Sequence, residues 1–266
     1  MAKLGNMAVG SIVKLNVSGV ATNFIVVHQG KPSTMYDDSC DGTWLLMEDI
    51  LKKVTWYQGS SPKNDYETSY MRSYLEGTVL GLFDSDIREL IKQVKIPYTK
   101  GESKTGAVGT LQTGANGLST KIFILSRVEV GASTAANKEG DKLSYFADET
   151  ASKRIAKLSG SATDWWTRSP NVAYSYATNV YRITSTGSCG AMSSSSSFGC
   201  RPAIIMPSEC GVDSSGFVLP SSGINGSVNI GGTWKELSAV HVNVGGVWKE
   251  VSVGYVNIGG VWKPIS

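Results

Sequence analysis

The sequence predicts an α+β fold, and two observations lead to that prediction. Helical and strand-like patterns are intermixed along residues 1–206 without a regular βαβ alternation, and residues 228–266 contain a tandem repeat of short strand patterns. The 266 residues, 41% of them hydrophobic, are enough for a large domain with an appendage, or for two domains. We expect a domain over residues 1–206, a Ser/Gly/Pro-rich linker over residues 207–227 and a β repeat over residues 228–266.

The first domain is expected to open with a hairpin. Residues 12–17 alternate apolar and polar side chains, residues 24–28 form a compact apolar run, and a Gly/Thr/Asn turn separates them. In residues 43–54 the apolar side chains recur at a period close to 3.6, which predicts a helix with one buried face. Residues 66–75 predict a short helix, with Asp65 as its N-cap and Gly77 just beyond its end.

The next segment carries the clearest helical pattern. Apolar residues in 86–94 follow the spacing i, i+3, i+4, i+7, and polar or acidic side chains precede them, as is typical of a helix start. Pro97 prevents continuation of this helix. Residues 98–120 are rich in Gly, Thr, Ser and Lys, which predicts an extended surface excursion.

Two more elements complete the predicted domain. Residues 122–125 predict a short buried strand. Residues 147–158 predict a helix, since the acidic pair Asp148 and Glu149 would lie near its N-terminus, where negative charge is favourable.

The C-terminal repeat has a period of 14 residues. Its units are residues 228–237, 242–251 and 256–265, and each predicts a strand, a Gly-Gly turn and a second strand. Equivalent positions carry Trp234, Trp248 and Trp262, followed by Lys235, Lys249 and Lys263. A unit this short cannot bury its own Trp, so two interpretations stay open: an appendage that packs on the main domain, and a module for oligomerisation or fibre attachment.

The segment most suggestive of function lies between two motifs, Trp-Trp-Thr-Arg-Ser-Pro at residues 165–170 and Phe-Gly-Cys-Arg-Pro-Ala at residues 198–203. Of the 28 residues from 171 to 198, 18 are Ser, Thr, Tyr, Asn or Gly and Arg182 alone is charged, whereas 18% of the whole chain is charged. Tyrosine supplies contact area at low rotamer cost and the small polar residues supply adaptable hydrogen bonds, as in antibody paratopes. This composition favours a binding loop in a rigid frame; a surface loop without a function is the alternative.

Composition and charge exclude several classes of partner. The net charge is +3 and the basic residues are scattered, so we expect no nucleic-acid partner. The N-terminal residues lack the apolar region of a secretory signal, and no apolar run reaches the length of a membrane span. We therefore expect synthesis in the bacterial cytoplasm and no membrane insertion.

The sequence offers little support for catalysis or for a cofactor. We find no pattern of a nucleophile beside a base, no phosphate-binding Gly motif and no C-x-x-C pair, so we expect a protein that is not an enzyme and holds no metal. Cys189 and Cys200 could lie near each other, although free buried thiols are the expectation for a protein made in the cytosol. Asp37, Asp38 and Asp41 could hold a cation or form a solvated turn.

The bracketing motifs supply candidate framework residues. Trp165 and Trp166 could stack on sugars, but adjacent residues of a strand point to opposite faces, so at least one belongs to the core. The guanidinium groups of Arg168 and Arg201 suit a framework role in which they tie down loop carbonyls or Asp164.

Five motifs together resemble a bacterial and phage domain family. They are residues 9–15 (VGSIVKL), 70–75 (YMRSYL), 124–130 (ILSRVEV), 165–170 (WWTRSP) and 199–204 (GCRPAI). That family has a C-type-lectin-like fold of the formylglycine-generating-enzyme type. Its members include variable proteins of diversity-generating retroelements, in which an error-prone reverse transcriptase rewrites adenine-containing codons to diversify ligand binding.

The resemblance implies that residues 171–197 form a receptor-contact surface on a lectin-like scaffold. On this basis alone the exchangeable, ligand-binding positions would be Asn171, Ala173, Tyr174, Ser175, Tyr176, Thr178, Asn179, Ser193, Ser194, Ser195, Ser196 and Ser197. The calcium-binding tripeptides of sugar-binding lectins are absent, so the resemblance does not imply calcium-dependent sugar binding. The separation of Cys189 and Cys200 does not match the copper-binding cysteine pair of formylglycine-generating oxidases.

The C-terminal repeat resembles units of phage tail-fibre and prophage structural proteins. Together, the two resemblances imply a non-enzymatic receptor-binding protein of a virion tail, with Tyr174 and Tyr176 as anchors. Its partners would be a host-cell surface protein or glycan and, through the repeat, phage tail proteins or further copies of the chain. The alternatives are an oxidase relative of the formylglycine-generating type and a purely structural tail or baseplate component.

Overall fold

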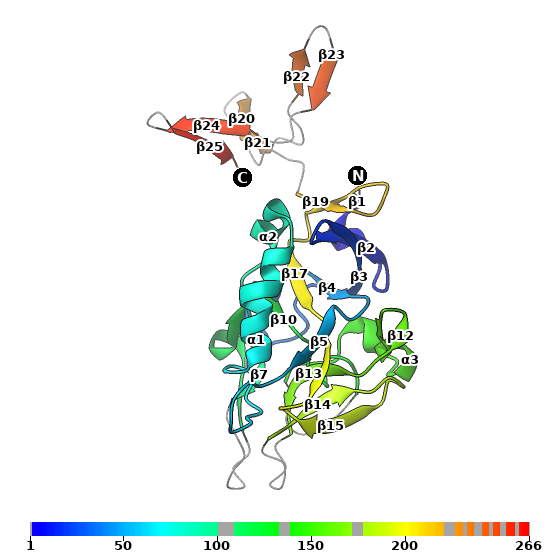
Figure 1. Ribbon diagram of the computed structural model, residues 1–266. Helices are drawn as coiled ribbons and strands as arrows, with labels where there is room; N and C mark the ends of the chain where they lie inside the picture. The colour runs from blue at the N-terminus through cyan, green and yellow to red at the C-terminus, as the bar shows by residue number, and fades with distance from the viewer. Residues whose placement is uncertain are drawn as a thin grey trace. The chain divides into compact units, whose positions relative to one another are not determined.

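The computed structural model describes residues 2–100, 109–132, 139–171 and 178–220, together with the backbone of the strands between residues 227 and 265. The chain divides into two compact units, Met1–Val218 and Leu219–Ser266. The first unit is rich in strands and contains a few short helices, which confirms the α+β class (Figure 1).

One five-stranded sheet forms the upper part of the first unit in Figure 1. Its strand order is β10-β17-β4-β3-β2, and all neighbouring pairs are antiparallel. The strands are β2 (Ile12–Val17), β3 (Val20–Gln29), β4 (Thr43–Met47), β10 (Ile122–Phe123) and β17 (Ala203–Met206). The predicted opening hairpin is therefore confirmed as β2–β3. The buried strand predicted for residues 122–125 is confirmed over its first half as β10, and Ile124 and Leu125 are buried but lie beyond the strand.

The helix predicted for residues 43–54 is wrong. Residues 43–47 form the central strand β4, and residues 52–55 form β5 in the other large sheet. Every residue of β4 is buried, because the strand is covered on both faces. A strand buried on both faces shows a continuous apolar run without period-two alternation, and such a run can imitate a helical spacing.

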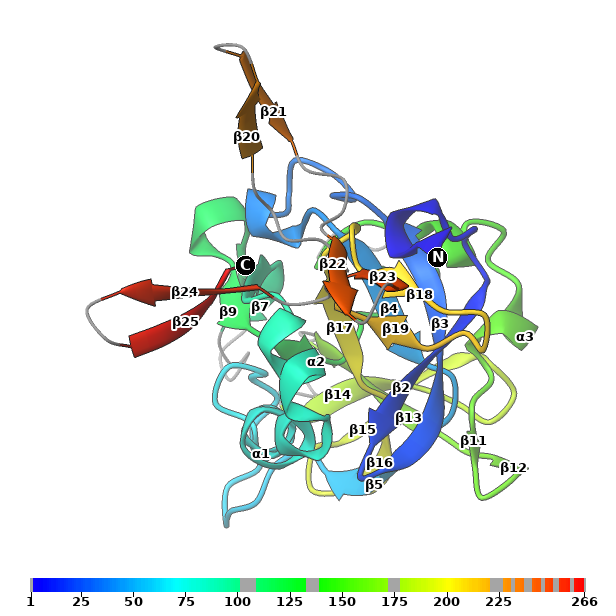
Figure 2. The ribbon, with the colours of Figure 1, turned by 90° about the horizontal axis from the view of Figure 1, so that it is seen from above.

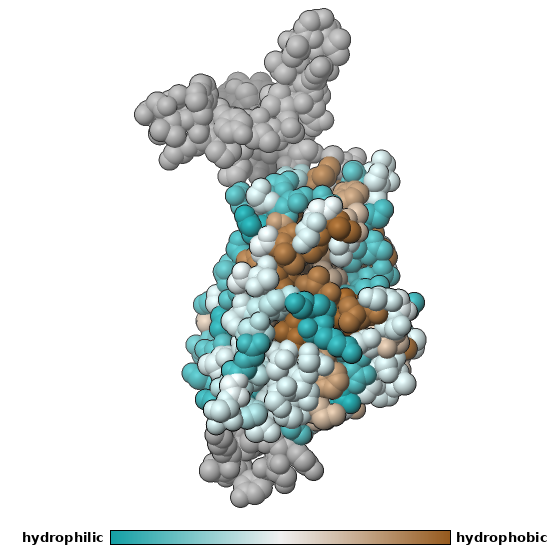
Figure 3. Space-filling view, in the orientation of Figure 1, coloured by the Kyte–Doolittle hydropathy of each residue, from teal (hydrophilic) through white to brown (hydrophobic). Residues whose placement is uncertain are grey.

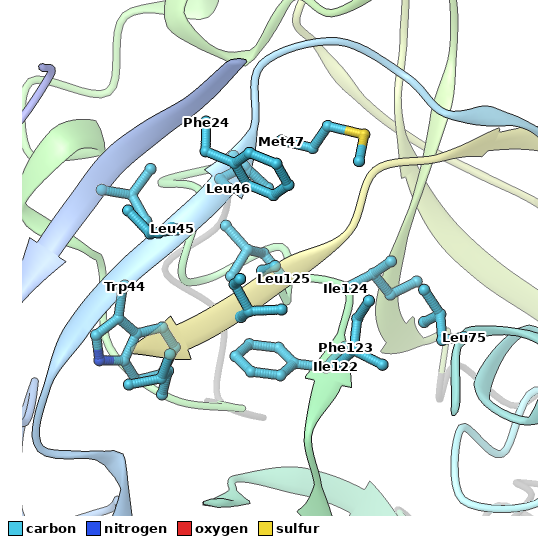
Figure 4. Close-up of a cluster of buried hydrophobic side chains, with 14 of the residues drawn as sticks. Phe24, Trp44, Leu45, Leu46, Met47, Leu75, Ile122, Phe123, Ile124 and Leu125 are labelled. Atoms are coloured by element: carbon cyan, nitrogen blue, oxygen red, sulfur yellow. The ribbon is translucent and has the colours of Figure 1, made fainter. Parts of the chain in front are cut away.

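The hydrophobic core lies against this first sheet (Figure 4). The close-up shows Phe24 of β3, the residues of β4 and the segment from Ile122 to Leu125 converging, with Leu75 beside them. The Trp44 ring makes edge-on contacts with Tyr36 and Phe123, with ring centroids 5.4 and 5.6 Å apart. Such aromatic pairs contribute about 0.5–1.5 kcal/mol each beyond the area that they bury.

The second large sheet has the order β15-β14-β13-β16-β5 and carries the segment of interest. Its strands are β5 (Lys52–Thr55), β13 (Trp165–Pro170), β14 (Asn179–Ile183), β15 (Cys189–Ser193) and β16 (Ser197–Cys200). Strands β13 and β16 are parallel, and the other neighbours are antiparallel. Strands β13 and β16 contain the two bracketing motifs. The segment 171–198 therefore begins directly after one of two adjacent strands and ends in the other.

The helices are shorter than predicted. They are α1 (Tyr70–Tyr74), a π-helical turn (Leu75–Val79), α2 (Ser85–Leu90) and α3 (Ala151–Arg154), with 3-10 turns at Leu4–Asn6, Asp38–Cys40, Leu80–Leu82, Gly114–Asn116 and Ser144–Phe146. In both ribbon views α1 and α2 lie on one side of the sheets, and α3 lies on the opposite side (Figures 1 and 2).

The ends of these helices differ from the prediction for local reasons. Ser69 caps α1 by accepting a hydrogen bond from the backbone N–H of Arg72. The Asp65 carboxylate instead accepts hydrogen bonds from the Glu67 N–H and the Thr68 hydroxyl, before the helix begins. Helix α2 ends at Leu90, because the backbone leaves the helical range at Ile91, where ψ is 118°, and Val94 then starts a strand. The helix predicted for residues 147–158 is reduced to the single turn of α3, since Glu149 has a φ of 55° that no right-handed helix allows.

The surface excursion predicted for residues 98–120 is also corrected. The described part of this segment forms β7 (Tyr98–Lys100), β8 (Thr110–Gln112) and β9 (Leu118–Thr120). Strand β8 pairs with β7, and β9 pairs with β6 (Val94–Ile96). Tyr98 and Thr99 are buried, so the segment begins inside the fold.

Residues near both ends of the first unit pair with each other. Strand β1 (Ala2–Lys3) pairs with β18 (Gly211–Val212), which neighbours β19 (Val218–Leu219). The first part of the segment interpreted as a linker thus belongs to the folded unit, which ends at Val218. A small hairpin of β11 (Lys157–Leu158) and β12 (Ser161–Ala162) completes the unit.

Each repeat of the second unit forms a two-stranded antiparallel hairpin, as predicted. The pairs are β20 (Ser227–Ile230) with β21 (Thr233–Glu236), β22 (His241–Val244) with β23 (Val247–Glu250), and β24 (Gly254–Ile258) with β25 (Val261–Ile265). The register is the same in all three: Trp234 pairs with Asn229, Trp248 with Asn243 and Trp262 with Asn257.

Candidate ligand-binding face

We call strands β13 and β16, together with the buried residues that hold them, the frame of the site. Its first members are the adjacent tryptophans of β13. Trp165 and Trp166 are both fully buried. The Trp165 indole N–H donates to the Arg154 carbonyl at 2.9 Å, and the Trp166 indole N–H donates to the Val54 carbonyl at 3.0 Å. Both rings therefore belong to the core, and neither is available to stack on a sugar.

Arg168 lies two residues after Trp166 on β13, and its side chain forms ion pairs and hydrogen bonds inside the first unit. Its guanidinium forms a two-pronged ion pair with Glu129, with N–O distances of 2.5 and 2.6 Å. The other three N–H groups donate to the carbonyls of Pro97, Ile124 and Glu139. All five donors of the side chain are thus used.

The environment of Arg168 is fully enclosed. Both Arg168 and Glu129 are 0% exposed, and Tyr36 also donates to the Glu129 carboxylate. Burial is the largest single influence and would lower the pKa of Arg168, but the charge and hydrogen bonds of Glu129, together with the charge of Glu139, outweigh it, and the pKa is raised. The framework role predicted for this residue is supported by the loop carbonyls that it holds.

Arg201 has a similar role with different partners. Its guanidinium donates to the carbonyls of Met47 and Glu48, both at 2.9 Å, and lies 5.0 Å from the ring centre of Trp165. Burial lowers the pKa of Arg201 to about 10. Of the two predicted tasks, Arg201 takes that of holding carbonyls, because Asp164 pairs with Arg182 at 2.7 Å.

The frame closes where the two bracketing motifs meet. Trp165 and Gly199 are register partners of the parallel pair β13–β16, and the Gly199 N–H donates to the Asp164 carbonyl. A Cβ at Gly199 would lie 2.8 Å from the Ile50 side chain, so the absence of a side chain permits this close approach.

The β14–β15 hairpin brings the two parts of the predicted variable segment together. Asn179 is the register partner of Ser193, and the Ser194 N–H donates to the Thr178 carbonyl at 2.8 Å. The Ser194 carbonyl in turn accepts from the Tyr57 N–H at 3.0 Å. Residues separated by 14 positions in the sequence thus form one continuous surface.

Most described positions of the predicted set are accessible. Ser195 and Ser197 are exposed, and Thr178, Asn179, Ser193 and Ser196 are partly exposed. In Figure 3 the lower part of the folded unit, where β14 and β15 lie in Figure 1, shows mainly pale surface of intermediate hydropathy. This agrees with a face made of small polar side chains.

Two positions of the predicted set are not surface positions. Ser194 is 0% exposed and Asn171 is 7% exposed. Ser194 points inward at the tight turn between β15 and β16, and the Asn171 backbone pairs with Asn179 and with the Asn64 amide. We correct both from exchangeable contacts to parts of the frame; Ala173, Tyr174, Ser175 and Tyr176 lie outside the described residues.

Tyr181 and Arg127, which were not among the predicted binding residues, share this surface. Tyr181 lies two residues from Asn179 on β14 and therefore on the same face, opposite Ala191. The Arg127 guanidinium lies 3.8 Å from the centre of the Tyr181 ring. On the other face of the hairpin, the Met192 side chain is 39% exposed. Alternation along β14 could have identified Tyr181, but no local pattern links Arg127 to it.

We call the side of the hairpin that carries Asn179, Tyr181, Ala191 and Ser193 the hairpin face. The hairpin is joined to the frame through β14, which pairs with β13, and β15 pairs with β14. The described residues of this face include no acidic side chain, and the same holds for the sequence from 171 to 198. The described residues of this face offer hydroxyl, amide and aromatic groups for hydrogen bonds and apolar contacts.

Comparison with known proteins identifies a family. Residues 41–208 match the model described as "Domain of unknown function (DUF6273)". The chain belongs to this family. No curated protein and no solved structure matches the chain. The match includes both bracketing motifs and the hairpin face, and it ends before the repeats.

The DUF6273 domain offers few groups for metal chemistry in its described part. No cluster of three or more His, Cys, Asp or Glu side chains occurs among the residues that the structure describes. Asp37 accepts from the Ser39 N–H and Asp38 pairs with Lys31, which agrees with the solvated-turn interpretation. All four cysteines are free thiols, and Cys189 is the one that is partly exposed.

An open cleft of about 550 Å³ lies beside the domain's turn at Ser194. Its lining comes from residues 57–76 and includes Tyr57, Tyr70, Glu67 and Arg72. Tyr57 connects the cleft to the Ser194 turn through the backbone hydrogen bond described above.

Among the described residues, no helix has both the length and the apolar character that crossing a bilayer requires.

Proposed function

We propose that this protein is a non-enzymatic binding protein that contacts its ligand through the hairpin face and the Ser193–Ser197 turn. One observation carries the proposal: polar, uncharged positions from both halves of the 171–198 segment meet on an accessible surface, while the ends of the segment are held by buried strands. Residues of this kind give adaptable hydrogen bonding, and a rigid frame limits the entropy lost on binding.

A C-type-lectin-like fold and a diversified segment are part of the same proposal. The separation between buried frame and accessible face supports it, because exposed polar side chains can be replaced at little cost in stability. The ligand would be a protein or glycan of a host-cell surface, and the protein would act on a virion or prophage tail. Weak individual sites would gain apparent affinity from display in many copies.

One observation favours this function over that of a formylglycine-generating oxidase. Cys189 lies on β15 and Cys200 on β16, and strands β14 and β13 lie between them in the sheet. Three strand spacings of about 4.8 Å put the two backbones roughly 14 Å apart, which is too far for both thiols to bind one copper ion.

The test exchanges accessible side chains and leaves the frame intact. In the full-length protein, Thr178, Asn179, Ser193 and Ser195 are replaced together by Tyr, Asp or Ala, and the labelled variants are incubated with a panel of bacterial strains. We expect the set of strains bound to change, with a shift in Tm of less than about 8 °C, since each of the four surface substitutions changes stability by about 0.5 kcal/mol or less.

A matched control carries the same replacements at Ser161 and Ala162, which are exposed on the separate β11–β12 hairpin. This control should bind the same strains as the wild-type protein. If the hairpin-face variants also bind the unchanged set of strains, the proposed function is wrong.

We propose the repeat unit as the attachment or oligomerisation module. The three hairpins share one register and have similar sequences, and an isolated two-stranded hairpin is only marginally stable. Sedimentation velocity of the full chain and of a variant with Trp234, Trp248 and Trp262 replaced by Ala tests the idea. A monomer in both cases would reject oligomerisation, and unchanged incorporation of the variant into tail particles would reject attachment.

A further inference from the structure

The stacked pair of Arg127 and Tyr181 stands at the centre of this inference. The guanidinium carbon of Arg127 lies 3.8 Å from the ring centroid of Tyr181, close enough for parallel stacking. The Arg127 backbone N–H donates to the Ser169 hydroxyl at 3.1 Å, and the Tyr181 hydroxyl lies 3.4 Å from Asn171 Oδ1. Both ends of the pair are therefore fixed to the buried frame.

Stacking leaves the edge of the guanidinium available. The Arg127 side chain makes no hydrogen bond or ion pair to any residue that the structure describes, and it is partly exposed. Arg182 on the same hairpin differs. It lies 4.9 Å from the Phe198 ring centre, but its Nε donates to Asp164 at 2.7 Å. Two arginines thus stack on aromatic rings of one sheet, and of these two Arg182 is already paired with a carboxylate.

The local electrostatics favour an anionic group at Arg127. Burial raises the pKa of Cys189 on β15, and three arginines, Arg127, Arg154 and Arg182, act in the opposite direction. Of these, Arg182 has an acidic partner among the described residues, whereas Arg154 donates to carbonyls. The hairpin face therefore carries positive charge beside side chains that are otherwise uncharged.

The geometry of a guanidinium narrows the class of anion. Its planar fork matches the two oxygens of a carboxylate, and an aromatic ring beneath it reduces the rotamer freedom lost on binding. Arginine and tyrosine are also the residue types enriched among the dominant contacts of protein interfaces. The face around the pair is a two-stranded ribbon, with Asn179, Ala191 and Ser193 as neighbouring positions, and such a flat surface fits another protein surface better than a single sugar ring.

We propose that Arg127, held on Tyr181, is a fixed recognition point for a carboxylate, and that the ligand places an Asp or Glu side chain of a protein there. This inference rests on the proposed function, and it adds one constant charged contact to a face of exchangeable polar ones. The residues around Arg127 would then determine which of the ligands with an acidic side chain are bound.

The experiment uses the full-length ¹⁵N-labelled protein and small probes in place of the ligand. The capped peptide acetyl-Gly-Asp-Gly-amide and its Asn counterpart are titrated while the side-chain Nε–H signals of the arginines are followed. We expect the Asp peptide to move the Arg127 signal in a saturable manner, the Asn peptide to leave it in place, and the Arg182 signal to stay unchanged with both. Equal responses to the two peptides, or no response of Arg127, would overturn the proposal.

Variants and a second probe sharpen the result. Arg127→Gln should weaken binding of the Asp peptide at least about tenfold, and Arg127→Lys should weaken it less, since lysine keeps the charge but loses the fork. Arg182→Gln is the matched control and should bind the peptide as the wild-type protein does. N-acetylneuraminic acid supplies the same carboxylate on a sugar, and a tighter response to it than to the Asp peptide would overturn the assignment to a protein side chain.

The two proposals can fail separately. If hairpin-face variants change the strains bound while Arg127→Gln leaves the Asp-peptide response intact, the function stands and the carboxylate site is wrong. If the Asp peptide binds Arg127 as expected but the hairpin-face variants bind an unchanged set of strains, the carboxylate site stands and the proposed function is wrong.

Discussion

Strand β13 and the β14–β15 hairpin are neighbours in one sheet, yet they differ in whether their polar side chains are buried or exposed. All six residues of β13 are buried, and Arg168 uses every one of its donors inside the protein. The hairpin leaves hydroxyl and amide groups accessible to solvent. The difference lies in burial: the polar groups of β13 have partners inside the protein, whereas several of those on the hairpin are accessible to solvent.

The largest expected effect concerns the centre of the frame. Arg168→Met should lower the free energy of unfolding by about 3–5 kcal/mol, because it leaves the buried Glu129 carboxylate without its cation. Arg182→Gln, which breaks the partly exposed pair with Asp164, should cost about 1 kcal/mol or less. Urea denaturation of the full chain, followed through its main transition, measures both.

Arg168→Lys guards against a variant that fails to fold. Lysine keeps the charge but cannot form the two-pronged contact or reach all three carbonyls, so its cost should fall between those of the other two variants. Equal costs for changes at Arg168 and at Arg182 would contradict the distinction between frame and hairpin.

A second prediction concerns Gly187, a frame position inside the 171–198 segment whose composition favours a binding loop. Gly187 has a φ of +80°, and a Cβ there would lie 2.0 Å from the carbonyl oxygen of Ala151. Gly187→Ala should therefore destabilise the protein by about 3 kcal/mol, from backbone strain and overpacking together. Gly160 is the matched control, because its φ is +82° and no atom lies within 4 Å of its Cβ position.

Gly160→Ala should cost about 1 kcal/mol, the contribution of the backbone conformation alone. The difference between the two glycine variants then measures the steric clash. Thermal unfolding monitored by circular dichroism is sufficient to detect it, and equal Tm shifts would show that the Ala151 carbonyl moves away at no cost.

A third prediction divides the serine run. Ser194→Tyr should cost about 1–3 kcal/mol, since the side chain at this position is enclosed, whereas Ser195→Tyr should change the free energy of unfolding by about 0.5 kcal/mol or less. Ser194→Ala should be neutral or slightly stabilising, because the Ser194 hydroxyl is buried without a partner among the described residues. Urea denaturation compares the three, and a costly Ser195→Tyr would place that position in the frame too.

These positions also show what the sequence can and cannot predict. The β2–β3 hairpin and the repeat hairpins were predictable, because alternation and Gly-Gly turns are local signals. The framework role of Arg168 followed from guanidinium chemistry, but its partner Glu129 lies 39 residues away and no local pattern connects them.

The errors have equally physical causes. Residues 43–54 imitated a helix because β4 is covered on both faces, a tertiary effect that overrides periodicity. Five consecutive serines carry no signal that separates Ser194 from Ser195; the tight turn to β16 decides which one points inward. The stacking of Arg127 on Tyr181 depends on the packing of a loop against β14 and was likewise inaccessible.

The smallest expected effect is a pH dependence within the frame. Glu139 is buried beside Arg168, and burial raises its pKa despite the nearby positive charge. A carboxyl with a higher pKa in the folded state binds its proton more tightly there, so its contribution to stability is complete below the unfolded value of 4.5 and is lost as the pH rises through the raised folded value. Glu139→Gln cannot titrate and should lack this loss.

Between pH 4 and pH 8, the unfolding free energy of the wild-type protein should therefore fall relative to that of Glu139→Gln. Asp148→Asn is a control of opposite sign: hydrogen bonding to Lys153 lowers the pKa of the exposed Asp148, so its contribution is present above 3.8 and is lost as the pH falls. Urea denaturation at several pH values gives both differences. Parallel curves for the wild-type protein and Glu139→Gln would show that Arg168 compensates the buried carboxylate completely, and the frame would then hold two anions on one cation.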